Sequence, residues 1–280
     1  MVKVSVLVPV YKTKLEYLKE SIESILNQSF KDFELVIVDD CPNDSREEFL
    51  KGYSDSRIRY YKNDKNLGIS ETRNKLLSLA RGEYIAIFDH DDISLPNRLQ
   101  LQVDYLDSHS FVGVVGGQME VFPEGRITNY PENNDEIKME LTFGDCVPHT
   151  AMMIRSSVLR ENNIKYESQF SPCEDYMICL RLINYTIFHN LPEILVKYRE
   201  LPGNTSDLQK EKMQDRTALC RCFADSNYPY LFNRYKSRQT EIYWIKLFMF
   251  IPCLKIVKKR FIQKYYLFGV IPLISKNLLS

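Results

Sequence analysis

Apolar runs and helix-like periodicity alternate along the first hundred residues of the chain. Four runs rich in β-branched and apolar residues have the pattern of buried strands: residues 2–10, 33–38, 57–62 and 84–88. Segments with apolar residues at helical spacing separate or follow these runs: residues 15–26, 69–80 and 96–106. This alternation predicts βαβ units and a parallel sheet covered by helices on both faces.

The rest of the chain has a more mixed pattern. Strand-like stretches recur at residues 112–115, 118–122, 150–154 and 194–199. Residues 175–184 have helical spacing, and the pattern is helical again from residue 208. We therefore predict a Rossmann-like α/β fold, with a mixed, mostly parallel central sheet flanked by helices and a C-terminal helical extension. The predicted boundary separates an α/β domain, residues 1–205, from a helical basic region, residues 206–280.

Charge is distributed unevenly, although the formal net charge is zero. After Glu241 there is no acidic residue, and the cations there are Lys246, Lys255, Lys258, Lys259, Arg260, Lys264 and Lys276. The first 241 residues therefore hold 30 of the 37 cations against all 37 acidic residues. Aromatic residues among these lysines favour an anionic membrane surface over nucleic acid as partner, contacted by a pair of interfacial helices. The alternative is a helical subdomain that packs on the core and has a basic face.

The cysteines and the apolar segments bear on the compartment. Seven cysteines are scattered without a CxxC pair, which argues against a zinc site and against a disulfide framework. We read them as reduced thiols of a cytoplasmic protein. The first residues already have a strand pattern, so we expect no signal peptide. The most apolar tail segment, residues 247–254, is too short to span a bilayer.

The strongest chemical signal is the acidic turn Asp89-His90-Asp91-Asp92, directly after the strand at residues 84–88. Carboxylates on one tight turn repel each other unless a cation neutralises them. Oxygen ligands suit Mg²⁺ or Mn²⁺, which bind through one or two carboxylates together with substrate phosphates. Ligands of parallel sheets bind beyond the carboxyl ends of the strands, where this turn is expected. The alternative is a solvated acidic turn that caps the following helix.

Two further segments are candidates for nucleotide binding. Asp39 and Asp40 end the second predicted strand, where a carboxylate can accept a hydrogen bond from a base or a ribose; the alternative is a turn aspartate. Residues 66–74 form a glycine turn that enters a helix. Its Arg73, with Lys65, can hold an anionic donor, and the alternative is an ordinary helix start.

Three later positions have candidate catalytic roles, each with a structural alternative. His149 can join a metal or a diphosphate, or it is a structural histidine. Glu174 or Asp175 can act as a general base on an acceptor hydroxyl, or the pair stabilises a helix N-terminus. Arg199 can stabilise a leaving diphosphate, or it is a surface arginine.

Seven segments, in this order and spacing, resemble glycosyltransferase family 2, whose members have the GT-A fold. They are residues 4–11, 24–30, 33–40, 66–74, 82–92, 148–155 and 174–176. Each motif is weak alone, but the ordered set is specific and covers about residues 2–205. Residues 265–273 are also similar to a tail segment of bacterial surface-polysaccharide transferases.

The resemblance implies roles for individual residues. Asp40 reads the base, usually uracil, with Asp39 beside it; Asp91 holds the metal; Asp89 contacts ribose or metal; and Asp175 is the general base. The full implied donor site is Pro9, Tyr11, Asp39, Asp40, Asn66, Arg73, Asp89, His90 and Arg199. The implied metal ligands, for Mn²⁺ or Mg²⁺, are Asp89, Asp91 and His149.

The expected function is therefore transfer of a sugar, with inversion, from a nucleotide-diphosphate donor to a glycan or lipid-linked acceptor. The expected location is the cytoplasmic face of the membrane, during surface-polysaccharide synthesis. One alternative is a sugar-phosphate nucleotidyltransferase, which needs a glycine-rich phosphate loop after the first strand, where residues 9–13 have no glycine. The other is a non-catalytic protein that binds membrane or nucleic acid through its basic tail.

Overall fold

The computed structural model describes residues 2–200, 209–248, 254–259, 262–267 and 271–277. The chain divides into two compact units, Met1–Phe223 and Ala224–Ser280. The predicted boundary between residues 205 and 206 lies outside the described residues.

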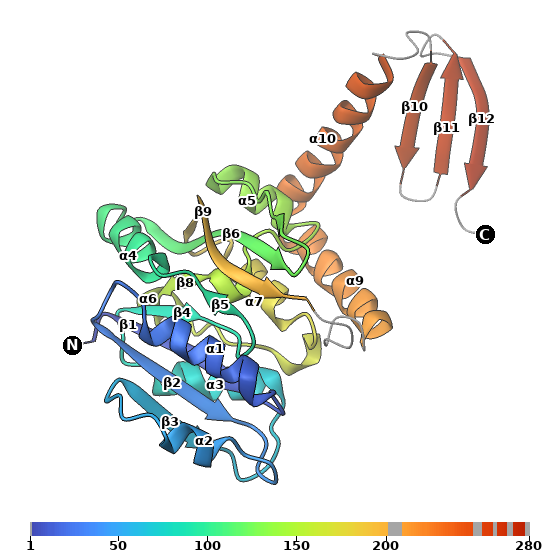
Figure 1. Ribbon diagram of the computed structural model, residues 1–280. Coiled ribbons are helices and arrows are strands. Elements are labelled where there is room, and N and C mark those ends of the chain that lie inside the picture. The colour runs from blue at the N-terminus through green and yellow to red at the C-terminus, as the bar shows by residue number, and fades with distance from the viewer. Residues whose placement is uncertain (1, 201–208, 249–253, 260–261, 268–270, 278–280) are drawn as a thin grey trace. The chain divides into compact units, whose positions relative to one another are not determined.

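A nine-stranded sheet with flanking helices forms the first unit (Figure 1). Its strands are β1 Val4–Val10, β2 Phe33–Asp39, β3 Ile58–Lys62, β4 Tyr84–Ile87, β5 Ile93–Ser94, β6 Val112–Phe122, β7 Arg126–Ile127, β8 Met153–Arg155 and β9 Ile187–Arg199. Its α-helices are α1 Leu15–Leu26, α2 Glu47–Lys51, α3 Ile69–Leu79, α4 Arg98–Ser108, α5 Asn134–Leu141, α6 Ser156–Glu161 and α7 Glu174–Leu182. Two short 3₁₀ helices are η1 His149–Ala151 and η2 Ser168–Phe170.

The strand order is β3-β2-β1-β4-β8-β6-β9-β5, and β7 pairs with β6. β1 is parallel to both β2 and β4, β2 is parallel to β3, and β6 is parallel to β9. β8 is antiparallel to β4 and β6, which makes the sheet mixed. The predicted fold class is confirmed. The chain moves outward from β1 to β3 and then returns to the other side of β1 as β4, so the topological switch point lies between β1 and β4.

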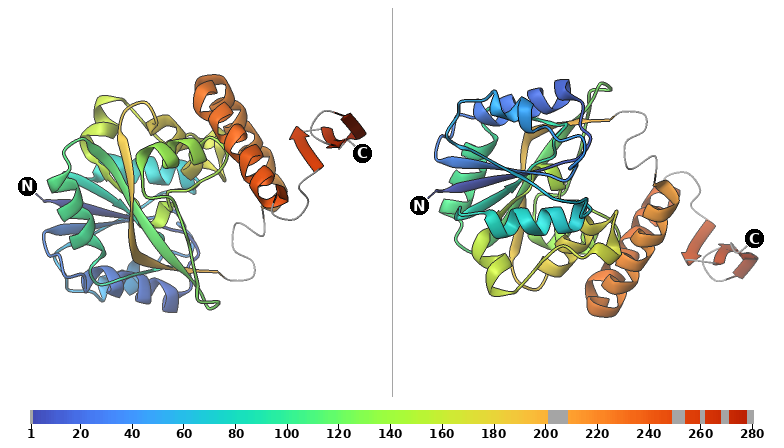
Figure 2. Two further views of the ribbon diagram at one scale, coloured as in Figure 1. Left: turned by 90° about the horizontal axis from the view of Figure 1, so that it is seen from above. Right: turned by 90° about the horizontal axis from the view of Figure 1, so that it is seen from below.

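Helices cover both faces of the sheet. As a result, β1 and β2 are buried along their whole lengths. Alternate residues of β1, from Val4 to Val10, share a core cluster with Leu18, Ile22 and Leu99 of α1 and α4. α3 contacts β1 and β2 and lies on the opposite face from α1, as the right-hand view of Figure 2 shows. The near-continuous apolar strands that the sequence contains are what a doubly covered sheet requires.

Several predicted boundaries are corrected by the fold. The stretches predicted at residues 112–115 and 118–122 form one long strand, β6, because Gly116 and Gly117 continue the extended backbone between them. Residues 150 and 151 of the strand predicted at 150–154 belong to η1, and the strand begins only at Met153.

The described residues of the second unit and of the segment before it contain two helices and a small sheet. α9 Lys210–Asn227 crosses the boundary between the units, and α10 Pro229–Phe248 follows it. An antiparallel three-stranded sheet follows, with strands β10 Leu254–Lys259, β11 Ile262–Leu267 and β12 Ile271–Asn277.

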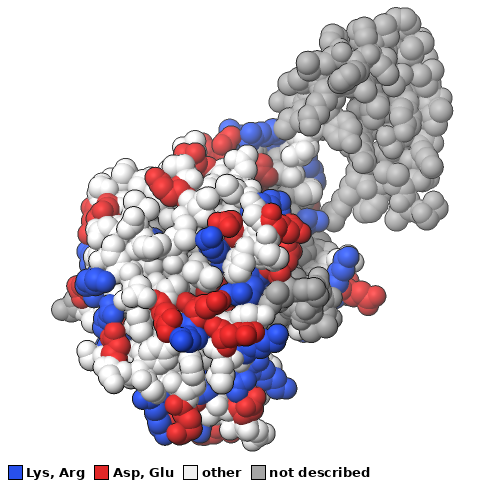
Figure 3. Space-filling view, viewed as in Figure 1, with Lys and Arg blue, Asp and Glu red and all other residues white. Residues whose placement is uncertain are grey.

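The prediction of an all-helical C-terminal region, with a pair of interfacial helices, is therefore wrong beyond residue 253. Each of the three stretches is six or seven residues long and rich in isoleucine, valine or tyrosine, which favours strands over helices. Within the described residues, none of the helices combines the length and the apolar character needed to cross a membrane. On the face of the first unit shown in Figure 3, acidic and basic side chains are interspersed.

Candidate active site

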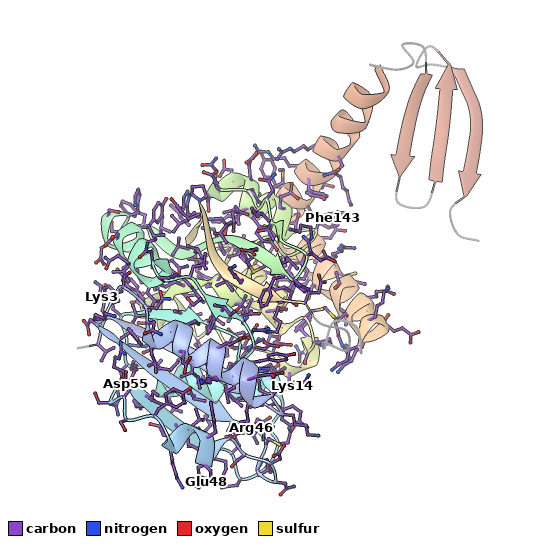
Figure 4. The ribbon with its side chains drawn as sticks, in the orientation of Figure 1. Lys3, Lys14, Arg46, Glu48, Asp55 and Phe143 are labelled. Carbon is purple, nitrogen blue, oxygen red and sulfur yellow. The ribbon has the colours of Figure 1, made fainter. Side chains whose placement is uncertain are left out.

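The candidate residues converge on the edge of the sheet where β1, β2 and β4 end. Because these strands are parallel, their carboxyl ends lie at one edge. The ladders continue past the strands, since Asp40 N donates to Val10 O at 2.8 Å and Phe88 N donates to Leu7 O at 3.1 Å. Figure 4 shows Lys3, before β1, at the opposite end of the unit from Lys14, which follows β1. Of the expected donor residues on this segment, Pro9 is buried in β1 and Tyr11 is 46% exposed.

Asp39 and Asp40 are both buried, and their carboxylates accept hydrogen bonds from nearby loops. Asp39 accepts from Cys41 N at 2.9 Å, Arg46 N at 2.6 Å and the Tyr60 hydroxyl at 3.1 Å. Its carboxylate thereby fixes the chain that leaves β2.

Asp40 has a similar role toward the loop that enters α3. It accepts from Asn63 Nδ2 at 2.8 Å, Leu67 N at 2.8 Å and Gly68 N at 2.9 Å, while Asn66 Nδ2 donates to its main-chain oxygen at 3.3 Å. Gly68 is the N-cap of α3, with φ of 81°, and has no side chain to cap the helix. Asp40 supplies the missing carboxylate from a distant strand.

The turn after β4 is electrostatically different, because its carboxylates crowd one another. Burial, followed by the charges of Asp89 and Asp91, raises the pKa of Asp92 well above its ordinary value. Burial, with Asp89 again adding to it, also raises the pKa of Asp91. Oδ2 of Asp92 is buried without a hydrogen-bond partner. The Asp91 side chain remains 29% exposed, and its Oδ1 lies 3.7 Å from Nδ1 of His90.

Arg73 on α3 joins this turn to the start of α7. Its guanidinium lies 3.2 Å from Asp89 Oδ1 and 2.6 Å from Glu174 Oε1. Burial opposes ionisation of Asp89, but the pKa of Asp89 is nevertheless lowered, chiefly by the charge and the hydrogen bond of Arg73. Arg73 therefore brings together acids that are far apart in the sequence.

The side chain of Asp175, next to Glu174, is held by a hydrogen bond to the main chain and not by an ion pair with Arg73. Its Oδ1 accepts a 2.7 Å hydrogen bond from Tyr176 N, and the side chain is partly exposed. Burial and then the charge of Glu174 raise the pKa of Asp175 to about 6, against the lowering effect of Arg73. Since Glu174 is 4% exposed and paired with Arg73, Asp175 is the member of the pair that remains available to a substrate.

His149 lies in η1 and is held by Tyr166. Its Nε2 is 2.9 Å from the Tyr166 hydroxyl, and its Nδ1 is buried without a partner. The main chain of Tyr166 is itself fixed by Asn74 of α3, through bonds of 2.9 Å and 3.0 Å. Burial, followed by the positive charge of Arg73, lowers the pKa of His149 to about 3, so the imidazole is neutral at neutral pH.

These residues suit a divalent cation only in part. No group of three His, Cys, Asp or Glu side chains with metal-binding geometry occurs within the described residues. Asp91 is partly exposed, and the unpartnered Nδ1 of a neutral His149, oriented through its other nitrogen, resembles a metal ligand. Asp89 is committed to Arg73. The arrangement fits a cation that takes one or two protein ligands and the rest from a bound diphosphate.

Arg199, at the end of β9, is bound to protein groups at several atoms. Its Nε donates to Asp91 O at 2.7 Å, its main-chain N donates to Asp92 Oδ1 at 2.8 Å, and its guanidinium pairs with Glu20 of α1. The structure thus places Arg199 beside the acidic turn, where its guanidinium holds the turn and α1 together.

Sequence reasoning missed the pairing partners of the site. Tyr166, Glu20 and the fully buried Arg98 have no motif around them. Arg98 donates to Ile87 O at 2.8 Å at the end of β4. The separation of 101 residues between Arg73 and Glu174 could not be bridged by any local pattern. The one usable signal was the conjunction of Arg73 and Asn74 on the same helix, both of which reach across to later segments.

The family model for Glycosyl transferase family 2 matches residues 5–163. An uncharacterized glycosyltransferase of Methanocaldococcus jannaschii is 38% identical over 222 residues, which cover 75% of this chain and 75% of that protein. The chain belongs to glycosyl transferase family 2. Membership of this family favours a glycosyltransferase over the two alternatives, a nucleotidyltransferase and a protein that only binds.

Solved structures of other glycosyltransferases have the same fold. The crystal structure of S. aureus TarS aligns with a TM-score of 0.64 and 21% identity, covering 89% of this chain and 44% of that chain. The family 2 chain thus spans less than half the length of that TarS chain. TarS 1-349 in complex with UDP-GlcNAc gives a TM-score of 0.65 at 21% identity, covering 89% of this chain and 73% of that chain. The mannosyltransferase PcManGT from Pyrobaculum calidifontis, in complex with GDP-Man and Mn²⁺, gives 0.55 at 14% identity, covering 89% and 81%.

Proposed function

We propose that this glycosyltransferase moves a sugar, with inversion at the anomeric carbon, from a UDP-sugar to a hydroxyl group of a glycan or lipid-linked acceptor. The observation that carries the proposal is the Arg73 bridge, which sets Asp89 at the switch point beside the Glu174-Asp175 pair. A donor bound beyond β1 and β4 then meets a carboxylate whose pKa is raised to about 6. The UDP-GlcNAc complex of the TarS fragment supports a uridine donor.

In the proposed reaction, Asp175 acts as the general base. Its carboxylate takes the proton of the acceptor hydroxyl as that oxygen attacks the anomeric carbon, and the bond from that carbon to the diphosphate oxygen breaks. The electron pair leaves with the diphosphate. A pKa of about 6 keeps Asp175 ionised at neutral pH while leaving it basic enough to accept a proton. Glu174 and Arg73 hold the start of α7 in place.

The proposed cofactor is Mn²⁺ or Mg²⁺, held by Asp91 and His149 together with the donor diphosphate. When bound, the cation neutralises the charge that develops on the leaving diphosphate. It would also offset the charge repulsion that adds to burial in raising the pKa of Asp91 and Asp92. The Mn²⁺ complex of PcManGT supports this assignment. On this proposal the loops that Asp39 and Asp40 hold lie beside the base, because both carboxylates are buried and bound to protein donors, and Asp89 with Arg73 supports the ribose side.

A donor panel tests the proposal directly. The purified protein is incubated with a set of UDP- and GDP-sugars with and without Mn²⁺, and released nucleotide is measured without acceptor. We expect metal-dependent release from one UDP-sugar. Asp175→Asn is expected to lower acceptor-dependent transfer by about 10²–10⁴-fold while leaving UDP binding intact, because a general base contributes that much. Equal turnover of Asp175→Asn and the parent would refute the role of Asp175.

We further propose that the second unit contacts an anionic membrane at the cytoplasmic face, in surface-polysaccharide synthesis. The register pairs Ile256 with Tyr265 and Tyr265 with Ile274 on one face of the small sheet, and Lys258 and Lys276, both paired with Gln263, belong to that face as well. Lys255 and Lys264 belong to the other face. Anionic leaflets attract such lysines by about 1 kcal/mol each.

Vesicle sedimentation tests this contact. We expect the full chain to sediment with phosphatidylglycerol vesicles, to release at high salt, and to stay in solution with phosphatidylcholine. Lys255→Gln combined with Lys264→Gln should weaken sedimentation, whereas the pair Lys31→Gln and Lys138→Gln in the first unit should not. Equal sedimentation with neutral vesicles would contradict an electrostatic contact.

A further inference from the structure

Arg199 is tied to the acidic turn by contacts that leave its side chain 9% exposed. Its Nε donates to the main-chain oxygen of Asp91 at 2.7 Å, and its own N donates to Asp92 Oδ1 at 2.8 Å. The guanidinium carbon lies 4.3 Å from the ring centre of Tyr17 and 4.6 Å from that of Phe122. Glu20 pairs with the same guanidinium. A guanidinium enclosed in this way has little surface left for contact with a substrate phosphate.

The same turn is attached to β9 and α1 on either side of Arg199. β5 follows Asp92 immediately and pairs with β9, through Ile93 with Lys197 and Ser94 with Val196. On the α1 side, Ser21 Oγ donates to Asp89 O at 3.1 Å, and Ser94 N donates to Ser24 Oγ at 3.0 Å. The turn therefore bridges a helix and a strand, and Arg199 contacts all three.

We propose that Arg199 is a positioning residue, which fixes the main chain of Asp91 so that the Asp91 carboxylate faces the diphosphate-bound cation. Glu20 on α1 holds the guanidinium in place through their ion pair. This inference rests on the proposed function, because it assigns Asp91 to the cation. It differs from the role that the sequence resemblance implied for Arg199, which was direct contact with the diphosphate.

The two roles make different demands on the residue. A diphosphate contact needs a positive charge, which lysine supplies. The positioning role needs a planar guanidinium that donates to Asp91 O and Glu20 at once, which lysine cannot reproduce. Arg199→Lys should therefore behave like Arg199→Met if the residue positions the turn, and like the parent if it binds phosphate.

The experiment measures UDP affinity by calorimetry with and without Mn²⁺, and amide hydrogen exchange of residues 88–95 in the ligand-free protein. We expect Arg199→Met and Arg199→Lys to lower the Mn²⁺-dependent UDP affinity by about tenfold, as expected for loss of a hydrogen bond to a charged group. UDP affinity without metal should stay within twofold of the parent, and exchange of residues 88–95 should accelerate. Glu20→Gln should act in the same direction, and its effect should not add to that of Arg199→Met.

Arg155 offers a matched control. It is an arginine at the end of β8 whose guanidinium donates to Leu106 O at 2.9 Å and Val112 O at 3.3 Å, beside the amino end of β4. Arg155→Met should lower thermal stability without changing the Mn²⁺-dependent affinity or the exchange of residues 88–95.

Two results would overturn the proposal. One is an equal loss of UDP affinity with and without Mn²⁺ that Arg199→Lys restores, which identifies a direct phosphate contact. The other is unchanged exchange of residues 88–95 in Arg199→Met. If the parent binds UDP without any Mn²⁺ dependence, the proposed cation fails, and the exchange of the ligand-free protein still decides whether Arg199 holds the turn.

Discussion

Two strands of the sheet end in acidic residues, and the two ends are built differently. After β2, each buried carboxylate of Asp39 and Asp40 accepts three hydrogen bonds from neighbouring loops. After β4, Asp92 has a buried oxygen without a partner, and burial and repulsion raise the pKa of Asp91 and Asp92. At the first end the protein compensates both carboxylates, whereas at the second Arg73 compensates Asp89 but Asp91 and Asp92 remain uncompensated.

The difference teaches that acidity alone does not identify a cation site. Carboxylates with hydrogen-bond donors around them stabilise loops, and here Asp40 stabilises the entry into α3, which carries Arg73. Carboxylates that repel each other either take up a proton or bind a cation. The β2 end thus holds the loops of the site in place, and on the proposed function the β4 end provides the charge that binds the cation.

The largest expected effect comes from removing charge at the β4 end. We expect Asp91→Asn to lower the transfer rate by about 10³-fold or more, because it removes the proposed carboxylate ligand. Its melting temperature should be unchanged or slightly raised, because a carboxylate that burial and Asp89 disfavour has been neutralised. Rates with saturating Mn²⁺ and a thermal melt measure the two effects. Asp104→Asn, on the exposed face of α4, is the control, and loss of less than tenfold in Asp91→Asn would remove Asp91 from the site.

The sequence predicted the positions of both acidic ends, because each follows an apolar strand and parallel strands end together. It also predicted the order of the longer elements up to α4, where apolar periodicity is clear, but it missed the short elements α2 and β5. The difference between the two ends could not be predicted, since the donors that satisfy Asp40 come from residues 63–68, after a further strand. The pairing of Arg73 with Glu174 and the burial of Arg98 depend on tertiary packing that local periodicity does not encode.

For the C-terminal strands, the sequence predicted the charge correctly and the secondary structure wrongly. The basic, aromatic composition after Glu241 was visible, but it suggested an interfacial helix pair. The same residues form short strands, in which Lys255 and Ile256 fall on opposite faces. Composition predicted the charge of this unit, while the choice between periods of 3.6 and 2.0 over six-residue stretches was too weakly determined.

At the β2 end, the comparison predicts a loss of stability. Asp40→Asn places an amide N–H₂ where one carboxylate oxygen receives main-chain donors, so at least one of Leu67 N and Gly68 N loses its acceptor. We expect a loss of about 3 kcal/mol in the free energy of unfolding, measured by urea denaturation. Asp64→Asn, exposed in the same loop, should change it by less than about 0.5 kcal/mol. A stability equal to the parent would mean that Asp40 does not hold the start of α3.

The pH dependence of transfer links the β4 end to the general base. Asp175 must be ionised to accept a proton, so the rate should rise with pH to a plateau, with a midpoint near its pKa of about 6. Below the midpoint the rate should fall by about tenfold per pH unit. Glu174→Gln removes a charge that raises this pKa, and the midpoint should therefore move to lower pH. An unmoved midpoint in Glu174→Gln would assign the titration to another group.

The smallest expected effect is at Asp39. Tyr60→Phe removes one of three donors to this carboxylate, the hydroxyl at 3.1 Å, and leaves the bonds from Cys41 N and Arg46 N. We expect a loss of about 1 kcal/mol in unfolding free energy and a KM for the donor within twofold of the parent, because two main-chain donors still fix the carboxylate. Tyr61→Phe is the matched change, since that hydroxyl accepts a hydrogen bond from Arg59, whereas the Tyr60 hydroxyl donates to the carboxylate of Asp39. A tenfold rise in donor KM in Tyr60→Phe alone would mean that the charge of Asp39, like that of Asp91, takes part in donor binding. The two strand ends would then differ only in degree.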